Sequence, residues 1–168
     1  MAAENFAVTE HLVLRPMASG DAAALAAYRS DPMQARYQSW ETPYAVDTAQ
    51  ALTAEMRDVR FAQPGSWLQV AIESAGRLIG DVAVRVDGDD PRQAEVGFTL
   101  AADAQGRGFA TEALRAVIPL LFTEHGMHRI TAVCDTRNDR SVALLERVGM
   151  HAPRSAPPEI RLVERRVD

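Results

Sequence analysis

The spacing of apolar and polar residues predicts a strand and two helices in the first third of the chain. Residues 11–15 have the pattern of a short strand and stop at a proline. Apolar residues then recur at helical spacing in residues 21–30 and again in residues 47–61. Between these helices, residues 33–45 predict a loop with three aromatic side chains, Tyr37, Trp40 and Tyr44.

The period changes to two in the middle of the chain, which predicts a meander of antiparallel strands. The strands are residues 67–73, 78–86 and 95–100, with turns at residues 74–76 and 87–91. The second turn is acidic and could in principle bind a cation. Clustered aspartate and glycine before proline is ordinary turn chemistry, so we favour a turn without a metal.

Helical spacing returns in the last third of the chain. Residues 109–122 place their apolar side chains on one stripe, which predicts a helix packed on a sheet and bent by Pro119. Residues 129–134 predict a strand, residues 139–148 an amphipathic helix and residues 160–167 a final strand. This order of elements predicts an α/β (α+β) fold, with helices on the faces of a mixed sheet.

Composition and charge narrow the class of protein. With 168 residues, 47% of them hydrophobic, the chain is expected to form one domain over residues 1–168. Its net charge of −5 argues against a general nucleic-acid or anionic-membrane surface. A single cysteine, Cys134, excludes an internal disulfide framework, and residues 1–20 lack the pattern of a secretory signal, so we expect a cytoplasmic protein. The chain contains no lysine, which excludes a Walker lysine and a Schiff-base lysine.

The segment Gln105-Gly106-Arg107-Gly108-Phe109-Ala110 follows a predicted strand and opens the longest amphipathic stripe. Its glycines let the backbone turn tightly, and the helix that begins there offers unpaired amides and the positive end of its dipole to an anion. This placement predicts a diphosphate site that needs neither lysine nor metal. A tight strand-to-helix turn without a ligand explains the pattern alone equally well. A dinucleotide-binding fold is disfavoured, because its glycine-rich turn follows the first strand.

The order of elements and several spaced motifs together resemble the GNAT superfamily of acyl-CoA-dependent N-acyltransferases. The resemblance is to the RimJ/RimL-like branch, which acylates protein N-terminal amines and small amines. It covers nearly the whole chain, and the glycine segment fits the family's Gln/Arg-x-x-Gly-x-Gly/Ala rule. The matching segments are Leu12-Val13-Leu14-Arg15-Pro16, Leu78-Ile79-Gly80-Asp81, Glu95-Val96-Gly97-Phe98, Gln105 to Leu114, Arg137 to Ser141 and Leu144 to Met150.

The resemblance implies a mostly antiparallel sheet that splays between its fourth and fifth strands and is flanked by about four helices. It implies acetyl-CoA as the acyl donor and no metal. The pantetheine arm would enter the splay along the fourth strand, and the amides that follow would bind the pyrophosphate. The cofactor-binding residues implied in this way are Phe98, Thr99, Leu100, Gln105, Gly106, Arg107, Gly108, Phe109, Ala110, Thr111, Asn138 and Ser141.

The resemblance also implies direct attack of an amine on the thioester in a ternary complex. Glu95 would accept the proton of the incoming ammonium, although a solvent-facing glutamate on an alternating strand is the plain alternative. Ser141 would assist the departing thiolate, and Asn138 would contact coenzyme A. The residues alone also fit a helix N-cap at Asn138 with Ser141 in the first turn, and both readings can hold together. Backbone amides at Leu100 would help to polarise the thioester carbonyl.

The acceptor is expected to be a primary amine, on a small molecule or a protein N-terminus, with the aromatic loop lining its pocket or roofing the core. The negative net charge mildly favours a cationic amine. Residues 151–168 are shorter than the hairpin that ends the family's sheet, which suggests a homodimer whose last strand pairs with a second subunit. The alternatives are a catalytically weak CoA-binding sensor or assembly module, and a succinyl-type transferase with a cation near the acyl end.

Overall fold

The computed structural model describes residues 4–153 and 160–166 of the chain. Apart from the short elements β1 and α2, the strands and helices follow the order that the sequence predicts. In chain order they are β1 (Ala7–Val8), β2 (Val13–Pro16), α1 (Ala22–Arg29), α2 (Pro32–Ala35), α3 (Val46–Met56), β3 (Trp67–Ser74), β4 (Arg77–Val86), β5 (Gln93–Leu100), α4 (Phe109–Thr123), β6 (Arg129–Asp135), α5 (Asp139–Arg147) and β7 (Ile160–Arg166).

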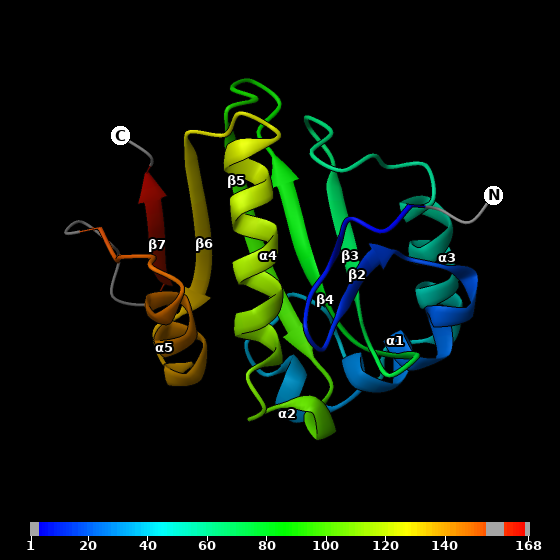
Figure 1. Ribbon diagram of the computed structural model, residues 1–168. Coiled ribbons are helices and arrows are strands. Elements are labelled where there is room, and N and C mark those ends of the chain that lie inside the picture. Colours follow the sequence, from blue (N-terminus) through cyan, green and yellow to red (C-terminus); the bar gives the residue numbers. More distant parts are fainter. Residues whose placement is uncertain (1–3, 154–159, 167–168) are drawn as a thin grey trace.

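The strands form one sheet in the order β1-β2-β3-β4-β5-β6-β7. Neighbouring strands are antiparallel except β5 and β6, which are parallel. In Figure 1, α4 crosses the sheet in front of β5, between β6 and β4. The predicted α/β class with a mixed, mostly antiparallel sheet is confirmed.

Two short elements are not predicted by the sequence pattern, and one helix ends earlier than predicted. Strand β1 is only two residues long, too short for a period to be seen. The Asp31-Pro32 pair ends α1, as predicted, but it also begins α2, because the Asp31 carboxylate accepts the amide of Met33 and proline suits the first helical position. Helix α3 ends at Met56 rather than near residue 61, and Ala62 beyond it has a φ of 59°, which a helix does not accommodate.

The sheet splays between β5 and β6, which are the fourth and fifth of the strands predicted from the sequence, as the family resemblance implied. These strands pair only at Gln93↔Arg129, Ala94↔Ile130 and Glu95↔Thr131. Beyond Glu95, β5 pairs with β4 alone, while β6 continues alongside β7. We call the gap between the diverging ends of β5 and β6 the wedge.

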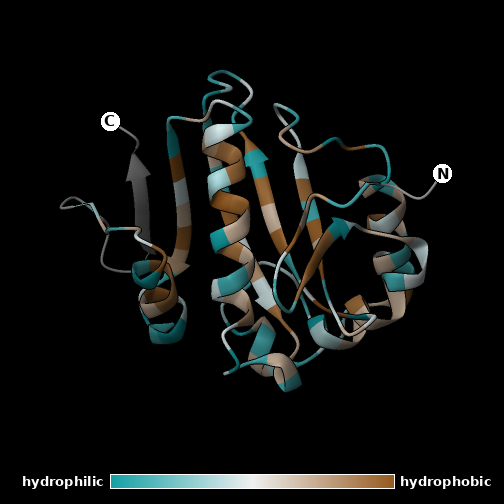
Figure 2. Ribbon diagram, viewed as in Figure 1, coloured by the Kyte–Doolittle hydropathy of each residue, from teal (hydrophilic) through white to brown (hydrophobic). Residues whose placement is uncertain are grey.

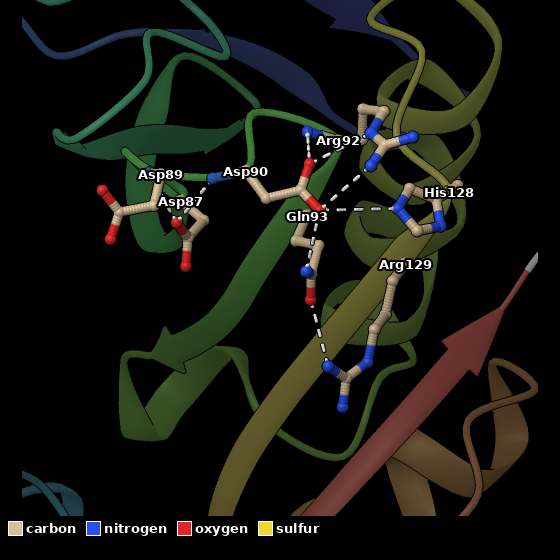
Figure 3. A network of polar contacts seen from close by, with 7 residues as sticks. All are labelled: Asp87, Asp89, Asp90, Arg92, Gln93, His128 and Arg129. Carbon is tan, nitrogen blue, oxygen red and sulfur yellow. Dashed lines mark hydrogen bonds and ion pairs between the residues drawn. The ribbon is translucent and has the colours of Figure 1, made fainter.

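A polar network fixes the closed end of the wedge (Figure 3). The Asp90 carboxylate accepts hydrogen bonds from Arg92 Nε at 3.0 Å and from Gln93 Nε2 at 3.0 Å. Gln93 Oε1 in turn accepts from Arg129 at 3.0 Å, which ties the first residue of β5 to the first residue of β6. Asp87 accepts the amides of two turn residues, so these aspartates serve the turn and the strand pairing.

Helix α4 supplies much of the core against one face of the sheet. Its buried stripe meets the apolar strands that lie behind it in Figure 2. Its buried residues include Ala113, Leu114, Val117, Ile118 and Leu121. The helix continues through the exposed Pro119 to Thr123, so the proline does not end it.

The final strand has its partner in the same chain. β7 pairs with β6 from Arg129↔Arg166 to Asp135↔Ile160. The dimer hypothesis assumed that this strand had no partner in its own chain, and that assumption is wrong. The last residue of the predicted strand, Val167, lies outside the described residues. None of the helices in the described part of the chain is long and apolar enough to cross a membrane.

Candidate active site

The glycine segment forms a tight loop that ends in the N-terminus of α4. Gly106 and Gly108 have φ values of 73° and 81°, which glycine adopts without strain. The first backbone hydrogen bond of the helix is from Glu112 N to Gly108 O at 2.9 Å. Within the described residues, the amides from Gly106 to Thr111 donate to no backbone acceptor. Six consecutive amides at the positive end of a 15-residue helix suit a diphosphate.

The Gln105 side chain holds this loop in place. Its Nε2 donates to Leu100 O at 3.2 Å, at the end of β5, and to Gln34 Oε1 at 2.7 Å, in α2. Gln105 therefore positions the amides that follow it, and its side chain is already occupied.

Arginines gather beside the loop. Arg107 is exposed, and its guanidinium lies 4.7 Å from the ring centre of Phe109. A depression next to the loop is also lined by Arg115 and Arg147. Arg147 donates to the hydroxyl of Thr111 at 3.4 Å. The backbone amide of Thr111, rather than its hydroxyl, is therefore the group that can bind a ligand. These cations suit the phosphates of a nucleotide-bearing ligand.

The free edge of β5 faces the wedge through Phe98 and Leu100. Ala101 N donates to Ile79 O of β4 at 2.8 Å, and backbone groups of a strand alternate between its two sides. The amides of Phe98 and Leu100 therefore point away from β4, toward the wedge. Thr99 turns its backbone to β4, and its hydroxyl accepts from Gln38 Nε2 at 3.4 Å. Of the three predicted edge residues, two offer backbone groups to an extended ligand.

Asn138 and Ser141 lie at the N-terminus of α5, on the other side of the wedge. Asn138 Oδ1 accepts the amide of Ser141 at 3.3 Å, so the predicted N-cap is present. The Ser141 side chain is half-buried, and its hydroxyl has no hydrogen-bond partner among the described residues. That hydroxyl can therefore donate to a ligand in the wedge.

Glu95 stands where the wedge closes. It is half-buried, and burial raises the pKa of its carboxyl, while the charge of Arg85 on β4 partly opposes that rise. By strand alternation Glu95 shares a face with Gly97 and Thr99. A carboxylate with a raised pKa at this place can accept a proton from an amine.

The three predicted acceptor aromatics lie in two places. Trp40 and Tyr44 pack on the buried guanidinium of Arg29, at 4.4 and 5.2 Å from their ring centres, and Trp40 Nε1 donates to Arg29 O at 2.9 Å. These two rings cover the C-terminal end of α1. Tyr37 lies at the wedge instead, where its hydroxyl donates to Arg137 O at 3.4 Å.

Residues 34–38 span the mouth of the wedge, which the sequence did not reveal. We call residues 105–111 the phosphate loop, after the ligand expected there. Gln34 contacts Gln105 of this loop, Gln38 contacts Thr99 of β5, and Tyr37 contacts Arg137 before α5. These side chains reach both sides of the wedge because of the path of this loop, which the sequence pattern does not reveal. A ligand in the wedge would therefore be covered by this segment.

Arg85 is a second residue that the sequence analysis missed. The strand register aligns four residues in one row across β3 to β6, namely Trp67, Arg85, Glu95 and Thr131. Directly opposed residues project on the same face of a sheet. Counting back from an 87–91 turn would have placed Arg85 opposite Gln93, on the same face as Glu95, because the connection between the paired positions Val86 and Ala94 is two residues longer than that turn.

The residues described above match a known family. The model of the acetyltransferase (GNAT) domain matches residues 11–151. The chain is 30% identical over 138 residues to the N-acetyltransferase p20 of Bacillus licheniformis, covering 82% of this chain and 77% of that protein.

Solved structures share the fold. The ribosomal alpha-N-protein acetyltransferase RimL, in complex with coenzyme A, superposes with a TM-score of 0.81 at 16% identity and covers 98% of this chain and 99% of its own. The spermidine N-acetyltransferase of Vibrio cholerae, in complex with CoA and spermine, gives a TM-score of 0.77 at 20% identity, with 94% and 96% covered. Both structures carry a fold that extends over nearly the whole of the present chain.

Proposed function

The chain belongs to the GNAT acetyltransferase family, and we propose that it transfers the acetyl group of acetyl-CoA to a primary amine by direct attack in a ternary complex. The observation that carries this proposal is the wedge, with unpaired amides of the phosphate loop at its mouth and Glu95 at its closed end. A thioester donor and an amine acceptor can meet between these two features.

The donor fits the residues present. The amides from Gly106 to Thr111 would bind the pyrophosphate, with Arg107 beside it. The amides of Phe98 and Leu100 would hydrogen-bond the pantetheine arm as an added strand and help to polarise the thioester carbonyl. No lysine or metal is required for this binding.

The chemistry requires one proton acceptor and one proton donor. The amine nitrogen forms a bond to the acetyl carbon as the carbon–sulfur bond breaks. The proton lost by the ammonium goes to Glu95, directly or through water. The departing thiolate takes its proton from solvent, and the Ser141 hydroxyl would donate a hydrogen bond that stabilises it as it leaves. Glu95 is suited to this role because burial holds its pKa above the ordinary value and no other described residue occupies its carboxylate.

The proposal is tested by thiol release from acetyl-CoA with a panel of amines, followed by mass spectrometry of the product. We expect acceptor-dependent release of coenzyme A and an N-acetyl product. Stabilisation of the protein by coenzyme A without turnover on any amine would favour the CoA-binding module instead. Full turnover by Glu95→Gln would reject its role as proton acceptor.

A further inference from the structure

Two glycines on facing strands β4 and β5 have different reasons to be glycine. A Cβ at Gly80 would lie 2.2 Å from Thr99 O, so the backbone itself requires glycine there. A Cβ at Gly97 would meet only the Cβ of Ala83, at 3.9 Å, and the φ of Gly97 is ordinary. Glycine weakens a strand interior, and one without a packing reason often marks the close approach of a ligand.

Gly97 lies beside the charged row of the sheet. Gly97 pairs with Ala83, and two residues closer to the turn that joins β4 and β5, on the same face, Glu95 pairs with Arg85. Because Ala83 and Gly97 have small or no side chains, the sheet surface next to the Glu95 carboxylate has no long side chain at this pair. The rims of this face are apolar and exposed: Trp67 is 39% exposed on β3 and Val133 is 45% exposed on β6.

Arg85 and Glu95 are opposed without being paired. No ion pair joins them to each other or to another described residue. The exposed Arg85 guanidinium instead lies 6.0 Å from the ring centre of Trp67. The Cβ atoms of directly opposed strand residues are about 5 Å apart. A cation and an anion thus stand at opposed positions of neighbouring strands, and neither forms an ion pair with a described residue.

We propose that this row selects an acceptor that carries a carboxylate next to its amine, as a free α-amino acid does. The ammonium of such a zwitterion would face Glu95, its carboxylate would face Arg85, and its Cα would lie over Gly97. The inference rests on the proposed acetyl transfer and names the substrate class of the same site. It makes Arg85 a specificity-determining residue and reverses the cationic acceptor that the net charge alone favours.

The experiment compares acceptors that differ only in the carboxylate. Acetyl-CoA is offered with each of a set of L-amino acids, with the α-amide of each, and with spermidine, and kcat/KM is measured for each acceptor. The wild type should prefer the acid over its amide by about tenfold or more, since a hydrogen bond to a charged group is lost with the amide. The amine of an α-amide is less basic than that of the acid, so a larger fraction of it is unprotonated and able to attack. This difference favours the amide, so it cannot be the cause of a preference for the acid.

Arg85→Gln should abolish the preference while the KM for acetyl-CoA stays the same. Arg60→Gln is the matched control, because it removes the same charge from an exposed position in the loop between α3 and β3, and it should keep the wild-type preference. Equal use of acids and amides by the wild type, or an unchanged preference in Arg85→Gln, would overturn the inference and leave acetyl transfer standing. Binding of coenzyme A without transfer to any acceptor would overturn both.

Discussion

Replacing Gly80 by alanine tests how closely β4 and β5 are packed at the edge of the wedge. The added Cβ would lie 2.2 Å from Thr99 O and 3.0 Å from Leu100 Cα, both backbone atoms of β5. A backbone cannot rotate away as a flexible side chain can, so β5 must shift. That shift moves the Leu100 amide, which we propose binds the donor.

The magnitude follows from overpacking a well-packed region, which costs about 1–3 kcal/mol. In a domain of this size 1 kcal/mol corresponds to roughly 2–4 °C, so Gly80→Ala should lower Tm by about 2–12 °C. Gly97→Ala is the matched control on the facing strand. Its Cβ meets only Ala83, at 3.9 Å, and alanine restricts the unfolded chain, so its stability should be unchanged or raised by up to about 1 kcal/mol.

Thermal unfolding and ligand titration separate the two variants. Gly80→Ala should melt lower and bind coenzyme A more weakly. Gly97→Ala should melt at the wild-type temperature or up to about 4 °C above it, bind coenzyme A normally and show a raised KM for the amine. A Gly80→Ala protein that melts within 1 °C of wild type, or a Gly97→Ala protein that melts as low as Gly80→Ala, would refute the packing argument.

Three further predictions concern single side chains. Glu95→Gln should lower kcat about 100-fold and remove the acidic limb of the kcat pH profile; in the wild type that limb should lie above the pH expected for an exposed glutamate, because burial raises the pKa of Glu95. Asn138→Ala should cost about 1 kcal/mol in urea unfolding through loss of the α5 N-cap, and a cost near zero would contradict the cap. Asp90→Asn should lower Tm at neutral pH, because hydrogen bonds from Arg92 and Gln93 hold the Asp90 pKa well below its ordinary value. That stabilisation is present above the ordinary carboxyl pKa and is lost as the pH falls toward the lowered one, so melting curves of wild type and variant should converge in acid.

The sequence sufficed for features that repeat or that depend on local backbone chemistry. The periods of two and 3.6 located β3 to β6 and α4, and the glycines at 106 and 108 located the tight loop before α4. Features that depend on the path of a loop could not be predicted. Gln34 and Gln38 reach Gln105 and Thr99 only because α2 turns residues 34–38 across the wedge.

Strand register explains the remaining difference between prediction and structure. Glu95 was singled out through its motif, but the role that we propose for it involves Arg85, whose position opposite Glu95 depends on the pairing of Val86 with Ala94 across the turn. A shift of one residue would have sent Arg85 to the other face. Sequence motifs therefore identified the catalytic candidate and not the charge beside it.

On the proposed geometry, the local charge beside Glu95 would select the acceptor more strongly than the net charge does. The net charge of −5 is spread over the whole surface, and at physiological salt its field is screened beyond about 8 Å. A unit charge about 4 Å from its partner contributes on the order of 1 kcal/mol even in water-like surroundings. Because Arg85 and Glu95 are directly opposed on β4 and β5, with their Cβ atoms about 5 Å apart, the carboxylate of an amino acid bound at Glu95 would be close enough to Arg85 for this attraction to count. A polyamine would bring a second cation toward Arg85, whereas an amino acid would bring the anion that Arg85 lacks.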